Sequence, residues 1–99
     1  MPGDPPARFE REMGCTEAEW LQWLPAAVGG RPLGLESGRA VVRLEDGTLE
    51  LRWRALPPRV IALLRIPRLQ VAFAFEGVGG ARRAEFMRHF DLFTQRGGG

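Results

Sequence analysis

A strict two-residue alternation in Thr48–Arg54 constrains the fold of this chain more than any other feature of the sequence. Leucine, leucine and tryptophan alternate there with one glutamate and two arginines, which predicts a strand with one buried and one hydrated face. A shorter alternation precedes it in Arg39–Leu44, and the dipeptide Asp46-Gly47 between the two segments is typical of a two-residue type I′ turn. The sequence therefore predicts an antiparallel hairpin.

Two further segments have strand character. Leu69–Glu76 alternates in the same way as Thr48–Arg54, so it is predicted to be a strand with its bulky apolar residues on the buried side. Val60–Ile66 is a short apolar run that fits either a strand or a helical turn. The proline pair 57–58 is expected to end the preceding strand, and Ile66–Arg68 is expected to form a turn.

Helical signals lie near both ends of the chain. Thr16 and Glu19 have the spacing of a capping box, which predicts that a helix begins there. Pro25 is expected to kink or end this helix, and the glycine-rich segment 29–38 that follows is predicted to be a loop. In residues 81–95, aromatic and methionine side chains recur at helical spacing, which predicts a second amphipathic helix.

These elements predict one α+β domain in the order α-β-β-β-β-α. The expected architecture is a two-layer sandwich, in which two helices cover one face of a four-stranded antiparallel sheet. A chain of 99 residues has room for one such core. We assign residues 13–96 to the domain, 1–12 to a flexible tail and 97–99 to a glycine tail. The side chains expected at the centre of the core are those of Trp53, Phe73 and Phe90.

The N-terminal sequence indicates a cytoplasmic protein. Residues 1–12 combine three prolines with five charges and lack the apolar segment that a secretory signal requires. No apolar run approaches the roughly 18 residues of a membrane span, so no membrane contact is expected. Either Met1 or Met13 is a plausible start of translation, because structure is predicted only from Met13 onward.

The chain is mildly basic, with a formal charge of +2, and all of its cations apart from the histidine are arginines. It has no lysine, asparagine or tyrosine, a composition typical of a bacterium with a G/C-rich genome. The segment between Glu50 and Glu76 contains no acid. Its arginines are either functional contacts for nucleic acid or another polyanion, or a consequence of codon usage. They are Arg52, Arg54, Arg59, Arg65 and Arg68.

The side of the sheet away from the predicted core is the strongest candidate for an interaction site. Val41, Ala72 and Ala74 give it a partly apolar surface, and exposed surfaces of this kind are often contact sites. The complete candidate face comprises Val41, Arg43, Arg52, Arg54, Ala72 and Ala74. Both signs of charge surround it, from Arg43, Arg52, Glu45, Glu50 and Glu76, which suits a symmetric homodimer. Alternatively, the N-terminal segment or the first helix covers this face.

Chemistry-bearing residues are few. Cys15 precedes the first helix, where the helix dipole favours a thiolate, and His89 on the second helix is its only possible histidine partner. A structural cysteine and a histidine at the edge of the core are the favoured interpretations. One histidine and one cysteine do not make a zinc site, and no cofactor motif is present, so neither a metal nor a cofactor is expected.

The C-terminal glycines 97–99 raise one further hypothesis. Ubiquitin-like and sulfur-carrier proteins end in a flexible Gly-Gly, but their tails follow a strand, whereas these glycines follow a predicted helix and fit an ordinary helix stop. The sequence has no phosphate loop, no G-x-S-x-G motif and no carboxylate pair with acid–base spacing, so an enzyme is the less favoured class. We expect a protein that acts through protein contacts as a homodimer. An arginine-mediated polyanion binder is the first alternative, and a thiol enzyme or a glycine-tail carrier is the second.

Overall fold

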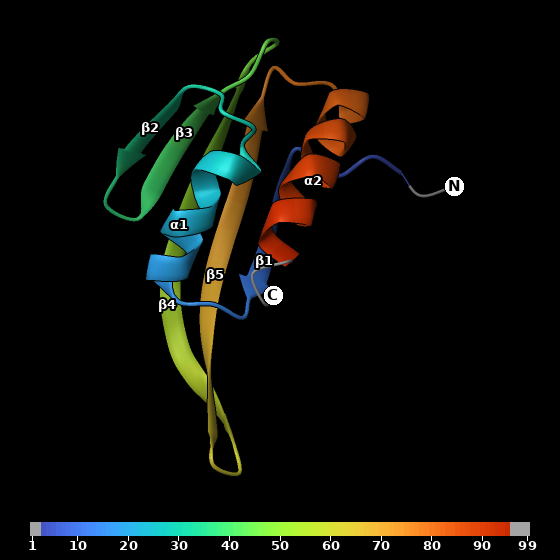
Figure 1. The fold of residues 1–99 in the computed structure, drawn as a ribbon. Coiled ribbons are helices and arrows are strands. Elements are labelled where there is room, and N and C mark those ends of the chain that lie inside the picture. Colours follow the sequence, from blue (N-terminus) through green and yellow to red (C-terminus); the bar gives the residue numbers. More distant parts are fainter. Residues whose placement is uncertain (1–2, 96–99) are drawn as a thin grey trace.

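The computed structural model describes residues 3–95, which form an α+β fold with two helices packed together over one face of an antiparallel sheet (Figure 1). The fold class agrees with the sequence prediction, but the sheet has five strands instead of four, in the order β1-β5-β4-β3-β2. The elements are β1 (Arg8–Met13), α1 (Glu17–Ala27), β2 (Leu33–Glu36), β3 (Arg39–Arg43), β4 (Thr48–Ile61), β5 (Leu64–Glu76) and α2 (Gly80–Gln95).

The core lies between the sheet and the two helices, as the alternation predicts. Trp53, Phe73 and Phe90 are 7%, 1% and 0% exposed, respectively. The Phe73 and Phe90 rings meet edge to face with centroids 5.5 Å apart, and Trp20 of α1 packs against both Trp53 and Phe90. Burying large aromatic rings from both layers in direct contact stabilises the sandwich.

The helix α1 begins as predicted but passes through its proline. The Thr16 hydroxyl accepts a hydrogen bond from the Glu19 backbone N–H at 3.1 Å, and the Glu19 carboxylate accepts one from the Thr16 N–H at 2.9 Å. The expected break at Pro25 is wrong, because the helix continues to Ala27. Pro25 lies in the last turn, so its missing N–H leaves only one intrahelical bond unmade.

The strand β1 corrects the prediction that residues 1–12 are a flexible tail. Its residues 8–13 pair antiparallel with residues 69–74 of β5 and form an edge of the sheet. Phe9 stacks on Phe73 with ring centroids 4.6 Å apart, and the Arg11 guanidinium forms an ion pair with Asp91 of α2. The edge strand is therefore fastened to both layers of the fold.

The strand β2 corrects the prediction of a loop over residues 29–38. It pairs antiparallel with β3, and the tight turn between them places Gly38 at a φ of +72°, where glycine carries no steric penalty. The expected two-residue type I′ turn at Asp46-Gly47 is also wrong. Four residues separate β3 from β4, and the Leu44 N–H donates to the Gly47 carbonyl at 2.8 Å.

The long strands β4 and β5 continue through the prolines that were expected to interrupt them. The register of β4 against β5 shifts between Leu56 and Arg59, so Pro57 and Pro58 occupy a bulge in β4. A missing backbone donor is tolerated at such a bulge. Val60–Ile66 is accordingly strand and turn, not a helical turn, and the expected turn at Ile66–Arg68 is absent. The two strands extend beyond the helices as a β-hairpin arm, residues 57–67, at the bottom of Figure 1.

Candidate interaction face

The face of the sheet opposite the helices, called the outer face below, carries the predicted interaction residues. Ala72 of β5 pairs in register with Arg52 of β4 and Glu10 of β1, whereas Ala74 pairs with Glu50 and Arg8. Because cross-strand partners point to the same side, the two alanines form a small-residue floor between charged walls. A shallow depression of about 370 Å³ lies over this floor.

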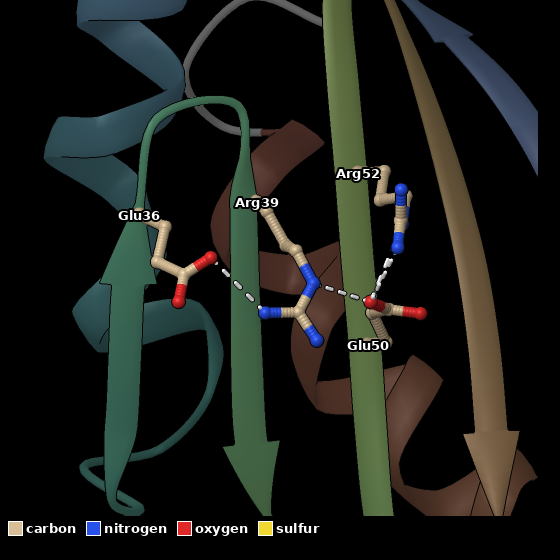
Figure 2. Close-up of polar contacts among 4 residues, drawn as sticks. All are labelled: Glu36, Arg39, Glu50 and Arg52. Carbon is tan, nitrogen blue, oxygen red and sulfur yellow. Dashed lines mark hydrogen bonds and ion pairs between the residues drawn. The ribbon is translucent and has the colours of Figure 1, made fainter.

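A chain of ion pairs crosses the outer face from β2 to β4, as Figure 2 shows for Glu36, Arg39, Glu50 and Arg52. Arg39 contacts Glu36 at 3.2 Å and also binds Glu50, whose carboxylate lies 3.2 Å from Arg52. Hydrogen bonding from Arg39, followed by that from Arg52, holds the pKa of the Glu50 carboxyl below its ordinary value of 4.5. Glu50 therefore carries a fixed negative charge at neutral pH.

The edge strand β1 supplies acids that were not expected to reach this face. Glu12 binds Arg68 at 2.8 Å and lies 3.6 Å from Arg59, and hydrogen bonding from Arg68 lowers the pKa of the Glu12 carboxyl. Glu10 accepts a hydrogen bond from the Gln70 amide at 2.8 Å. The charges of Arg59 and Arg68 are thus partly neutralised by Glu12, which β1 brings to this face.

The predicted arginine contacts therefore fall into two groups. Arg52, Arg59 and Arg68 form ion pairs within the chain. In the described part of the chain, residues 3–95, no carboxylate lies within 4 Å of the remaining three. These are Arg43, Arg54 and Arg65.

The acids expected to meet a partner's arginines are also engaged within the chain. Glu76 binds Arg8 at 3.0 Å, and Glu45 lies 3.3 Å from Arg82. Sequence reasoning missed these pairs because Arg8 was assigned to a flexible tail and Arg82 to a distant helix. Within the described residues, the charge pattern of the outer face is mainly a set of internal pairs.

Neither alternative cover of the outer face is observed. The N-terminal segment joins the sheet as its edge strand, and α1 packs with α2 on the opposite side. Val41 is half-buried between the neighbouring strands and borders a second shallow depression, together with Arg43 and Gly34. Within residues 3–95, the alanine floor and the Val41 surface are therefore open.

The structure separates Cys15 from His89. Cys15 is 1% exposed just before α1, whereas the His89 ring lies 3.0 Å from the Ala26 carbonyl at the other end of that helix. Eleven helical residues separate the two sites by about 15 Å. Burial, and secondarily the Glu19 charge, raise the pKa of the Cys15 thiol to about 11. The arrangement does not support a thiol nucleophile or a cysteine–histidine pair.

The arm carries the predicted anion contacts Arg59 and Arg65, and it also exposes an apolar surface that the sequence did not predict. Its apolar side chains are exposed, and Leu63 at the turn is 100% exposed. The apolar run Val60–Ile66 was the available signal, but its interpretation as either a strand or a helical turn did not predict an exposed hairpin. The exposed apolar residues of the arm are Val60, Ile61, Leu63, Leu64 and Ile66.

Comparisons with protein-family models, with curated proteins and with solved structures gave no match. Among residues 3–95, no helix has the length and apolar character needed to cross a membrane. The same residues contain no cluster of three or more histidine, cysteine or acidic side chains suited to a metal ion. The predicted glycine tail, residues 97–99, lies outside the described residues.

Proposed function

We propose that this protein is an interaction module that self-associates through the outer face of its sheet. The observation that carries the proposal is the open alanine floor of Ala72 and Ala74, which both helices leave uncovered. Small side chains let a second layer approach a sheet closely, and a two-fold axis makes one such surface self-complementary. The protein then acts by presenting a paired scaffold to further proteins.

The internal ion pairs favour this use of the face. Arg39, Glu50 and Arg52 hold one another in fixed positions beside the floor, so little side-chain entropy is lost when a second surface approaches. With Glu36, which pairs with Arg39, two arginines face two carboxylates, and this balance lowers the cost of removing water from the rim. Apolar contact over the floor then supplies the attraction.

Sedimentation at micromolar concentration tests the proposal. The wild-type protein is expected near twice the chain mass of 11.0 kDa. Ala74→Arg is expected to give a folded monomer, because its new side chain is hydrated once the copies separate. Ala81→Arg is the matched control, since Ala81 is exposed on α2 at the helix side of the molecule. A wild-type mass near 11.0 kDa rejects self-association.

A second candidate function is supported by the arginines without an internal carboxylate partner. Arg43 of β3 and Arg54 of β4 lie on the outer face and are exposed, so they can contact a phosphate chain. Binding to single-stranded DNA would then weaken steeply with salt, and Arg43→Gln with Arg54→Gln would flatten that dependence. Arg88→Gln, at an exposed position on α2, is the control. No retention on heparin at low salt rejects this function.

A further inference from the structure

The arm carries bulky apolar side chains on the same side of the sheet as the alanine floor. Within β5, Leu64, Ile66, Ala72 and Ala74 are separated by even numbers of residues, so they point to one side. The pairing of Ile61 with Leu64 places a third apolar side chain beside them. The outer face therefore has bulky apolar side chains on the arm and small ones at the alanine floor, along the same strand.

The geometry points to a specific partner for this arm, namely the alanine floor of a second copy. The inference rests on the proposed self-association and assigns its contacts. Leu64 and Ala74 lie equally far from Leu69 along β5, in opposite directions, and so do Ile66 and Ala72. A two-fold axis that crosses the strands at the level of Leu69 consequently places Leu64 over the partner's Ala74 and Ile66 over the partner's Ala72.

The size of the contact supports this arrangement. Without the arm, the paired part of β4, β5 and β1 would bury about 900 Å² in total between two copies, which is below the usual size of a specific interface. The arm extends the molecule to a length of 45 Å. Using the whole outer face raises the buried area to about 1,300 Å², within the range of stable complexes.

Charge also favours a second copy as the occupant. The arm and its neighbouring strand segments contain no acid between Glu50 and Glu76. On the outer face of the arm, Arg59 lies opposite Ile66 and shares the carboxylate of Glu12 with Arg68. At the level of the floor, the only side-chain partner of Glu10 within residues 3–95 is the neutral amide of Gln70. When the outer faces of two copies pack with their strands running in opposite directions, the basic arm of each copy lies near Glu10 of the other.

Cross-linking tests the contact directly. In a Cys15→Ala background, Leu64→Cys with Ala74→Cys should be joined into a covalent dimer by a bis-maleimide that spans the roughly 10 Å between packed sheets. Each single-cysteine variant is its own control, because two copies of the same position lie about 33 Å apart in this arrangement. Cross-linking of either single variant as readily as the double variant overturns the assignment.

A second comparison separates the arm contact from self-association itself. Leu64→Ser with Ile66→Ser should weaken the dimer at least tenfold, whereas Leu63→Ser at the apex should change its Kd less than twofold. If the wild type is a dimer and the double variant Leu64→Ser with Ile66→Ser leaves its Kd unchanged, the proposed function stands but arm docking is rejected. A wild-type monomer rejects both. A monomer that binds anionic vesicles and loses binding with Leu63→Ser assigns the arm to a membrane surface instead.

Discussion

At the scale of single residues, Gly47 is required by a close backbone approach and not by an unusual conformation. A Cβ atom added there would lie 1.9 Å from the Glu76 carbonyl oxygen, so the β3–β4 loop would have to move away from the end of β5. Gly47→Ala is therefore expected to lower the free energy of unfolding by about 1–3 kcal/mol.

Gly34 on β2 provides the matched control for that change. A Cβ atom at Gly34 has nothing within 4 Å, and its φ is not positive. Gly34→Ala should therefore leave the midpoint of urea unfolding unchanged or raise it slightly. Equal midpoints for the two variants would contradict the close approach at Gly47.

Cys15 provides a second prediction at this scale. With its thiol pKa raised from 9.0 to about 11, only about one molecule in a thousand carries the thiolate at pH 8. A disulfide reagent such as Ellman's should therefore label the native protein slowly and the urea-unfolded protein quickly. A raised pKa also means that this burial stabilises the fold below pH 9, an effect lost as pH rises through about 11. Rapid labelling of the native protein would contradict the burial of Cys15.

At the scale of elements, the strands with a clear alternation were predictable, and those that depend on distant partners were not. The inward and outward faces of β3, β4 and β5 follow directly from the sequence, because one face must be buried. In β1 the side chains that face the helices are Phe9, Arg11 and Met13. A charged Arg11 at an inward position breaks the apolar alternation, so the sequence did not indicate a strand there. The Arg11 guanidinium lies over the Phe9 and Phe73 rings, at 5.6 and 5.7 Å, and pairs with Asp91.

The interaction face likewise has parts that follow from the sequence and parts that depend on distant strands. The outward orientation of Ala72 and Ala74 follows from the two-residue period of β5 alone. The ion pairs do not, because Glu12 reaches Arg68 only after β1 has joined the sheet beside β5. The length of the arm was also hidden, since Pro57 and Pro58 are tolerated only because a bulge separates them from the hydrogen-bonded ladder.

Removal of β1 is the element-scale prediction. A chain beginning at Met13 lacks the strand that pairs with β5, and it exposes the Phe73 ring that Phe9 covers. We expect it to unfold at a markedly lower urea concentration than the full chain, by several kcal/mol in the free energy of unfolding. A chain beginning at Ala7 keeps β1 and should behave like the full chain. Equal stability of the two truncated chains would contradict a structural role for β1.

At the scale of the whole molecule, self-association should appear in thermal stability as well as in mass. A dimer that forms only from folded chains stabilises them by mass action, so its Tm rises with protein concentration. For a domain of this size, a hundredfold increase in concentration above the Kd should raise the Tm by roughly 5–10 °C. Differential scanning calorimetry between a few micromolar and a few hundred micromolar measures this shift.

The variant Ala74→Arg links that shift to the outer face. Its Tm should be independent of concentration and should equal the value that the wild type approaches at high dilution, because only the contact between copies is lost. Ala81→Arg, on the helix side, should retain the concentration dependence. If Ala74→Arg instead lowers the Tm equally at every concentration, the alanine floor stabilises the single chain and does not join two copies. If the wild-type Tm is independent of concentration, the outer face is open for a different partner.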